Sequence, residues 1–388
     1  MNVSLDAAIN NTHTTSSQRL GNRPTGPMTE PSGSHPSSPG KPLSAMSAAE
    51  GDDVPNSNDI DSVLSESADD NGCDAFSGVF SADSISMSED VRDYVYENSR
   101  RYHKYNEGLY HFPNDDAEQE REDLQHAMTM LLCDGKLHFA PLQNPQAVLD
   151  IGTGTGIWAI DMGDEYPGSE VLGIDLSPIQ PLWVPRNVQF LVDNLEEDWL
   201  QPANSLDFIH GRQMAPSIRN WPKMIAEAYN ALKPGGWIEF QELECVVKCD
   251  DGTMSEDDAC AGYAKTLMAA LHRLGIDSLG FIANCRQWLR DAGFINVRDT
   301  VLKTPIGTWP KDPHQQKIGL YSRNMIYDGL HGFSIKPFTH GLGWTPEEVE
   351  VYLVDVRKAL LNTTAHIYLP FHVVYAQKPL TPQTRSAE

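Results

Sequence analysis

Two hydrophobic patterns, one of helical and one of extended spacing, alternate along the chain after residue 112. Leu124, Met128, Leu131 and Leu132 recur at helical spacing, which predicts an amphipathic helix within 113–137. Short apolar runs predict strands at 147–152, 170–175, 188–193, 206–211 and 237–247, and helical patterns lie between them at 156–168 and 220–236. Because parallel strands need crossover connections, this alternation predicts an α/β fold, a mostly parallel sheet with helices on both faces.

The first 90 residues show neither pattern. They contain 18 Ser, 7 Gly and 7 Pro, 3 basic against 14 acidic residues, and Phe76 and Phe80 as their only aromatic residues. A segment of this composition cannot bury enough apolar surface to offset the entropy that folding costs. We predict a disordered acidic tail over 1–90 and a folded domain over 91–380. Within the tail, DAFSGVF (74–80) is either a short docking motif or an incidental aromatic pair.

The charge and composition of the whole chain exclude several classes of partner. Its 388 residues carry a formal net charge of -25, which repels phosphate backbones and argues against direct nucleic-acid binding. No stretch approaches the roughly 20 apolar residues that span a bilayer, and the N-terminus lacks the pattern of a secretory signal. Six scattered cysteines are typical of thiols in a reducing compartment. We predict an intracellular protein, cytoplasmic or nuclear, with no membrane span.

The stretch VLDIGTGTGIW (148–158) carries the most specific chemical signal. Gly152, Gly154 and Gly156 lie where the first strand ends and a helix begins, so backbone N–H groups can approach a ligand with no Cβ in the way. Asp175 ends the next strand, in position to accept hydrogen bonds from a ribose. Together these features predict a nucleoside-containing cofactor. The G-x-G-x-G spacing behind Asp150 differs by one residue from the G-x-G-x-x-G of dinucleotide sites.

Four motifs in order resemble those of the class I S-adenosylmethionine-dependent methyltransferases. They are VLDIGTGTG, the strands that end in Asp175 and in Asp193, and LKPGGWIEFQE (232–242). Three longer segments resemble the fungal LaeA-like members of this class: RRYHKYNEGLYHFPNDDAEQEREDLQH, GIDLSPIQPLWVPRNVQFLVDNLEEDW and IHGRQMAPSIRNWPK. The resemblance runs from about residue 92 to residue 378. That family includes regulators of secondary metabolism and development, and other members with uncertain substrates.

The resemblance implies a seven-strand Rossmann-like methyltransferase sheet with helices on both faces, extra N-terminal helices and helical insertions. Segments 295–307 and 366–379 would complete the sheet, and the last strand would be antiparallel. The cofactor-binding half would occupy about 145–245, with helical additions at about 250–290 and 310–362.

The resemblance also implies which residues bind S-adenosylmethionine. The expected ligands lie at the carboxyl ends of the first three strands: Asp150, Gly152, Gly154, Gly156, Asp175, Asp193 and Asn194. The three glycines would wrap the methionine moiety and the ribose, while Asp150 would orient their loop and reach the amino group through water. Asp175 would accept the ribose hydroxyls, and Asp193 with the backbone of Asn194 would meet the adenine edge.

No universal catalytic residue is expected, because a sulfonium methyl group is already an activated electrophile and catalysis is mostly positioning and exclusion of water. By motif position, His210 and Arg212 lie near the methyl group. His210 is either a base or a hydrogen-bonded structural histidine, and Arg212 either holds an acidic substrate or pairs with a carboxylate. Tyr102, His103 and Tyr110 either form a lid over the cofactor or belong to the core of an N-terminal helical segment.

We expect no metal site. Cys245 and Cys249 form C-x3-C, but no second Cys or His pair follows at zinc spacing. The acidic stretch NLEEDW (194–199) is more simply a solvated loop that follows Asp193.

Three functional hypotheses remain. The leading one is a LaeA-like methyltransferase acting on an unidentified protein or small-molecule acceptor. The second is a regulatory subunit that keeps the methyltransferase fold but works by binding partners such as velvet-type regulators. The third, an NAD-dependent oxidoreductase, is disfavoured by the G-x-G-x-G spacing and by the acids Asp150 and Asp193.

Overall fold

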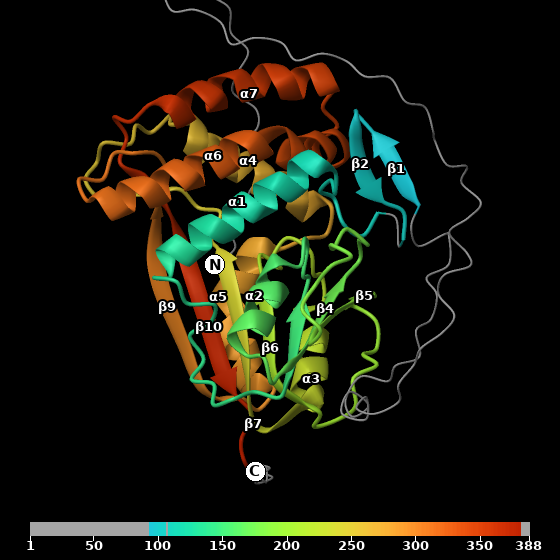
Figure 1. The fold of residues 1–388 in the computed structure, drawn as a ribbon. Coiled ribbons are helices and arrows are strands. Elements are labelled where there is room, and N and C mark those ends of the chain that lie inside the picture. The colour runs from blue at the N-terminus through green and yellow to red at the C-terminus, as the bar shows by residue number, and fades with distance from the viewer. Residues whose placement is uncertain (1–92, 106–107, 382–388) are drawn as a thin grey trace, which may run out of the picture. The chain divides into compact units, whose positions relative to one another are not determined.

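The computed structural model describes residues 93–105 and 108–381 (Figure 1). The tail predicted over 1–90, with its DAFSGVF motif, lies outside these described residues. Of the helices within them, none combines the length and the apolar character needed to cross a bilayer.

Eight strands of the described chain form one sheet. They are β3 (Ala147–Ile151), β4 (Glu170–Asp175), β5 (Val188–Val192), β6 (Leu206–Arg212), β7 (Leu232–Leu243), β8 (Lys248–Cys249), β9 (Ile295–Pro305) and β10 (Ile367–Gln377). The sheet order is β5-β4-β3-β6-β7-β10, with β9 and the short β8 also paired to β10. β3 to β7 are parallel, whereas β10 is antiparallel to β7 and β9. The predicted seven-strand sheet and its antiparallel last strand are confirmed.

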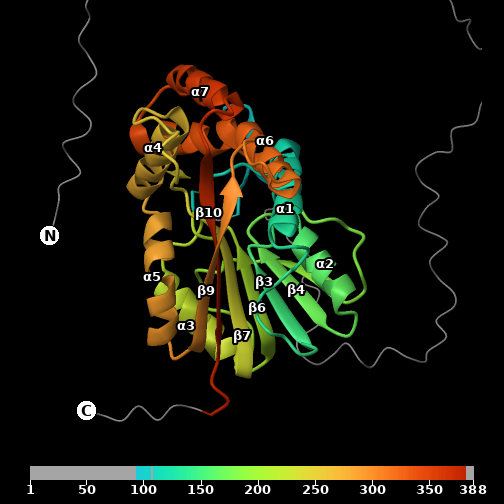
Figure 2. The ribbon, with the colours of Figure 1, turned by 90° about the vertical axis from the view of Figure 1, so that its left-hand side faces the viewer.

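Helices cover both faces and one end of the sheet. In Figure 2, α2 (Ile157–Glu165) lies on one face, and α3 (Trp221–Ala231) and α5 (Ser278–Asp291) lie on the other. The remaining helices gather at one end of the sheet (Figure 1): α1 (Asp116–Leu132), α4 (Ala259–Arg273), α6 (Pro313–Lys336) and α7 (Pro346–Leu361). A π-helical turn, Pro337–Leu342, continues α6. Of these helices, α4 lies within the predicted helical addition at about 250–290, and α6 and α7 lie within the one at about 310–362.

The segment before α1 is a β-hairpin, so the expectation of a helix around Tyr102 and His103 is wrong. β1 (Tyr94–Glu97) pairs antiparallel with β2 (Arg100–His103). The two residues between them, Asn98 and Ser99, have φ of 49° and 62°. A two-residue turn with both residues left-handed matches the twist of antiparallel strands, which explains why this short polar sequence forms a hairpin.

The boundary between α3 and β7 also differs from the expected one. The helix ends at Ala231 instead of continuing to residue 236, and Leu232 already has extended geometry, with ψ of 139°. Pro234 disfavours the helical conformation at the residue before it, and this forces the chain out of the helix early. Leu232 therefore begins β7 and does not belong to the buried face of the helix.

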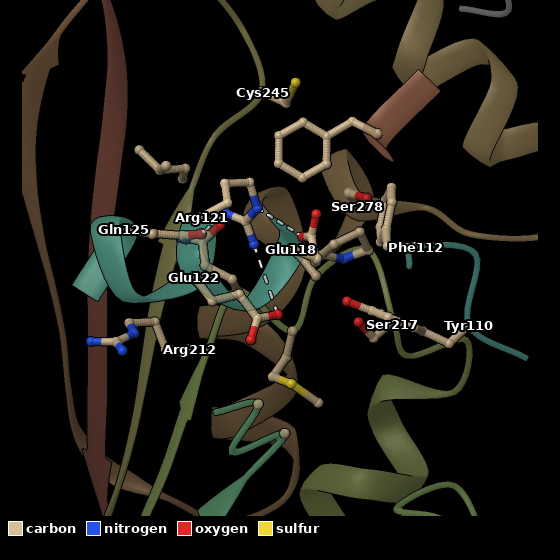
Figure 3. A pocket seen from close by; sticks show the side chains of 18 of the residues that line it. Tyr110, Phe112, Glu118, Arg121, Glu122, Gln125, Arg212, Ser217, Cys245 and Ser278 are labelled. Carbon is tan, nitrogen blue, oxygen red and sulfur yellow. Dashed lines mark hydrogen bonds and ion pairs between the residues drawn. The ribbon is translucent and has the colours of Figure 1, made fainter. Parts of the chain in front are cut away.

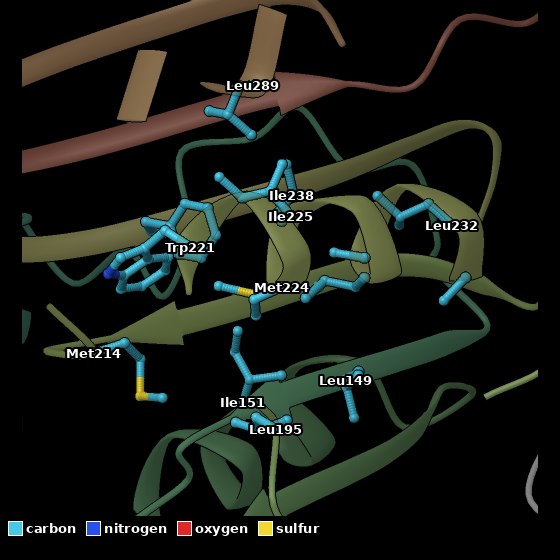
Figure 4. Packing of buried hydrophobic residues seen from close by; sticks show 14 of the residues in the cluster. Leu149, Ile151, Leu195, Met214, Trp221, Met224, Ile225, Leu232, Ile238 and Leu289 are labelled. Carbon is cyan, nitrogen blue, oxygen red and sulfur yellow. The ribbon is translucent and has the colours of Figure 1, made fainter. Parts of the chain in front are cut away.

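The core has two main parts. Between the sheet and α3, Ile151, Trp221 and Ile225 belong to one buried cluster (Figure 4). A second cluster joins the insertions and includes Leu271 of α4 and Leu353 of α7. Burying a side chain of this size stabilises the folded state by about 1.5–3 kcal/mol. The helices at the strand ends are therefore held by a core of their own.

Candidate active site

A cavity of about 300 Å³ lies between the carboxyl ends of the parallel strands and the helices at that end. Its walls include residues of β3, β4 and β6 and of α1, α4, α6 and α7. The strand order reverses between β3 and β6, and open α/β sheets bind ligands at such a switch point. The cavity also has a volume typical of small-molecule sites.

The glycine loop forms one wall of the cavity. Gly152, Gly154 and Gly156 all have left-handed φ, of 66°, 56° and 81°. A Cβ built on Gly154 would lie 2.8 Å from Oε2 of Glu122 on α1. The N–H of Gly152 donates to the carbonyl oxygen of Ile174 at 2.8 Å, which ties the loop to the end of β4. The left-handed conformation therefore favours glycine at all three positions, and a side chain at 154 would also displace the Glu122 carboxyl group.

Asp150 connects the loop to the neighbouring strand β6. Its buried carboxylate accepts a hydrogen bond from the Thr153 hydroxyl at 2.6 Å and lies 2.8 Å from Nδ1 of His210. The fully buried His210 ring stacks on Trp158, with ring centroids 3.7 Å apart. Burial lowers the pKa of His210, so at neutral pH the ring is uncharged and Nδ1 donates to Asp150. Its Nε2 is enclosed and has no partner in the described chain.

The acids of the next two strands lie beside the loop. Asp175 accepts from the backbone N–H groups of Gly154 and Ser177, both at 2.9 Å. Asp193, just beyond β5, accepts from the N–H of Asn194 at 2.8 Å. Burial raises the pKa of both carboxyl groups. Because a carboxylate has about four acceptor positions, each can still accept from a ligand in the cavity.

Similarity to known proteins decides the family. Residues 124–298 match the family model described as a methyltransferase domain. Methyltransferase pytC of Aspergillus terreus is 42% identical over 296 residues, which cover 76% of this chain and 91% of that protein. The secondary metabolism regulator LAE1 of Cochliobolus heterostrophus is 37% identical over 290 residues, covering 73% and 94%. The protein-methionine methyltransferase laeA of Emericella nidulans is 31% identical over 293 residues, covering 73% and 76%.

The chain belongs to the LaeA-like methyltransferases. As a class I methyltransferase it binds S-adenosylmethionine, and the oxidoreductase hypothesis is thereby excluded. The side of the cavity that carries the glycine loop and the carboxyl groups, called the polar wall, fits a cofactor with a ribose diol and two positive charges. It presents the glycine loop and six carboxyl groups, those of Glu118, Glu122, Asp150, Asp175, Asp193 and Glu196. Which of these residues binds which part of the cofactor stays a prediction.

Four polar residues of α1 that the sequence did not single out line the cavity of this LaeA-like methyltransferase. Glu118, Arg121, Glu122 and Gln125 recur at helical spacing (Figure 3). Arg121 donates to Glu118 at 2.8 Å and lies 3.8 Å from Glu122. Oε2 of Glu122 is enclosed without a hydrogen-bond partner in the described chain, and burial raises the pKa of this carboxyl to about 8. The regular spacing was visible in the sequence, but a solvent-facing stripe has the same appearance.

Arg212, at the end of β6, is a cation on the cavity wall. It donates from Nη2 to Nδ1 of His126 at 3.0 Å, and Nε2 of that histidine lies 2.9 Å from Asp161. Nη1 is enclosed and has no hydrogen-bond partner among the described residues. Among the described residues, no carboxylate forms an ion pair with Arg212, so the pairing considered from the sequence is not observed there. An unpaired guanidinium N–H on a cavity wall can hold an anionic group.

Of the three aromatic residues considered for a lid, only Tyr110 lines the cavity. Its ring packs edge-on against Phe112, with centroids 5.5 Å apart. Tyr102 is buried elsewhere, where the Lys336 ammonium lies 4.4 Å from the centre of its ring. Nδ1 of His103 lies 2.6 Å from the carbonyl oxygen of Tyr105. The hairpin residues Tyr102 and His103 therefore support the fold around the site and do not face the cofactor cavity.

Proposed function

We propose that this LaeA-like chain is a working methyltransferase and not only a regulatory subunit. The observation that carries the proposal is the shared cavity, which runs from the glycine loop to the inserted helices. The part of the cavity beyond the polar wall can hold a methyl acceptor beside the cofactor. A subunit that kept the fold only to bind partners on its surface would need no such space.

The proposed cofactor contacts follow from the geometry of the loop and the strand ends. Gly152 and Gly154 lie on the cavity wall, where their backbone contacts the methionine moiety; Asp175 accepts from the ribose, and Asp193 meets the adenine. His210 acts as a positioning residue that holds Asp150, because its Nδ1 bonds the carboxylate and its Nε2 is enclosed. This supports the structural interpretation of His210 over that of a base.

Bound S-adenosylmethionine supplies an already activated methyl group. The protein's own task is therefore to align the acceptor with that group and to exclude water from the site. The inserted helices close the cavity over the strand ends and are suited to exclude water. Arg212 offers an unpaired N–H to the carboxylate of the cofactor or to an acidic acceptor.

Labelled S-adenosylmethionine tests for turnover. The purified full chain is incubated with methyl-labelled cofactor and, separately, with a protein lysate and an organic extract of the source cells. We expect label to accumulate in one fraction beyond one methyl group per chain, and not with the cofactor-binding variant Gly154→Val. Cofactor binding without label in either fraction would instead support the regulatory subunit with velvet-type partners. The similarity to the regulator LAE1 keeps that second proposal open.

Glu122 gives the site a measurable proton signature. Its pKa of about 8 means that the carboxyl is mostly protonated at pH 7 before the cofactor binds. A cationic ligand beside it favours the ionised form and lowers that pKa, so binding releases a proton. We expect calorimetry at pH 7, in buffers of different ionisation enthalpy, to show release of up to about one proton per cofactor. Equal release by Glu122→Gln would show that another group loses the proton.

A further inference from the structure

The charged residues of the cavity wall and a large group of its uncharged residues come from different parts of the chain. Every charged residue on the wall lies between Glu118 and Arg212. The wall residues from Leu243 to Leu369 include no Asp, Glu, Lys, Arg or His. We call this second part the apolar compartment. It is formed by the end of β7 and by residues of α4, α6, α7 and β10.

The apolar compartment is built from aliphatic and thioether side chains. Among them are Val247, Leu267 and Met268, and also Met325 of α6 and Val356 of α7. Such side chains offer no hydrogen bonds and favour apolar ligand surface.

The polar side chains of the apolar compartment, Cys245, Cys260, Tyr263 and Ser278, carry no charge at neutral pH. The Ser278 hydroxyl is enclosed without a hydrogen-bond partner in the described chain. Burial raises the pKa of the Cys245 and Cys260 thiols to about 12, so both are uncharged at neutral pH. The Tyr263 hydroxyl lies 3.0 Å from the Ser334 hydroxyl and is thereby paired. In Figure 3, Arg121 and Glu118 lie between Cys245 on one side and Arg212 on the other. The charged residues of α1 that line the cavity, Glu118, Arg121 and Glu122, form the charged band beside the glycine loop.

We propose that the apolar compartment binds the methyl acceptor, and that this acceptor is a largely apolar small molecule with one polar, methyl-accepting group. The proposal rests on the function proposed above and specifies its substrate class. The apolar body of the acceptor fills the uncharged part of the cavity. Its polar group then lies at the charged band, toward the glycine loop.

A peptide acceptor fits this compartment poorly. A peptide brings backbone N–H and C=O groups, each of which costs free energy if it is buried without a hydrogen-bond partner. The compartment wall offers few such partners. A single methionine side chain, as methylated by the relative laeA, is small and would leave much of the apolar wall uncovered.

The transfer balances without any further reactant. A lone pair of the acceptor's polar atom forms the new bond to the methyl carbon. The carbon–sulfur bond breaks, and its electron pair stays on sulfur. A hydroxyl or amine acceptor gives its proton to a carboxylate of the charged band, and the proton passes to bulk water when the product leaves.

Substitutions on α4 test the proposal with a matched control. Ala264 is buried on the compartment wall, whereas Ala269 on the same helix is exposed. Ala264→Phe fills the compartment and Ala269→Phe adds the same ring in solvent. Met268→Gln keeps the size of a wall residue but makes it polar, and so serves if the larger side chain disturbs folding. The uncharged dye Nile red is titrated into each full-length variant, and S-adenosylmethionine is titrated separately by calorimetry.

We expect saturable binding of one Nile red per wild-type chain, displaced by decanol. Ala264→Phe and Met268→Gln should lower the affinity for Nile red at least about tenfold, whereas Ala269→Phe should leave it unchanged. All three variants should bind S-adenosylmethionine like the wild type. The proposal is overturned if a chain that binds the cofactor does not bind the dye, if neither wall variant weakens it, or if N-acetylmethionine methylamide displaces it better than decanol. If the wild type binds the dye but not S-adenosylmethionine, the proposed function is overturned. The separate calorimetric titration distinguishes this outcome from failure of the compartment proposal.

Discussion

Gly154→Val should abolish S-adenosylmethionine binding, with a loss of at least about a hundredfold in affinity. Gly154 has φ of 56°, a conformation that costs a residue with a Cβ on the order of 1–2 kcal/mol and a β-branched residue more. The new Cβ would also lie 2.8 Å from Oε2 of Glu122, so the carboxylate has to leave the loop. The left-handed φ of residue 154 therefore accounts for most of the strain, and the Glu122 side chain moves away from the loop. Calorimetric titration measures the loss, and thermal unfolding shows how much of it is general destabilisation.

Gly168→Val is the matched control for this substitution. Gly168 does not have a left-handed φ, and a Cβ there would meet nothing within 4 Å. We expect this control to bind S-adenosylmethionine like the parent chain. If Gly154→Val also binds within about tenfold of the parent, the glycine loop is not where the cofactor lies.

Asp175→Ala should weaken S-adenosylmethionine binding at least about tenfold, because a charged acceptor for the ribose hydroxyls is lost. It should also lower the free energy of unfolding by about 1–3 kcal/mol, since the N–H groups of Gly154 and Ser177 lose their acceptor. Asp175→Asn keeps one acceptor oxygen. Its cofactor affinity and its free energy of unfolding should both lie between those of the parent chain and of Asp175→Ala.

Calorimetry and thermal unfolding together separate a ligand-binding aspartate from a structural one. An Asp175 that only stabilised the turn would lower stability on replacement and leave cofactor affinity unchanged. That result would remove the ribose contact from the proposed site and leave the role of the glycine loop to be tested by Gly154→Val alone.

The sheet and the glycine loop were predictable because their signals are local. Buried parallel strands read as short apolar runs, and AVLDI, EVLGI and LDFIH are such runs. The left-handed φ of Gly152 and Gly154 follows from a spacing visible in the sequence. The hairpin was not predictable in this way, because its turn is made by Asn98 and Ser99 without the glycine that usually marks one.

The α1 wall and the apolar compartment depend on contacts between distant segments. Glu118, Arg121 and Glu122 read as the polar face of a surface helix until α6 and the glycine loop are placed beside them. The residues of the apolar compartment read as ordinary core positions, because a helix has the same pattern whether it packs against another helix or against a ligand. Only the tertiary structure shows which apolar residues surround space.

The separation of charged and uncharged wall residues along the chain also bears on how such proteins diverge. The charged wall residues end at Arg212 and the apolar compartment begins at Leu243, with α3 and all but the last residue of β7 between them. Mutation or recombination beyond β7 would therefore reshape the proposed acceptor compartment and leave the proposed cofactor contacts, which lie upstream, unchanged. A lineage with this arrangement can acquire new methylated products without passing through an ancestor that has lost its cofactor.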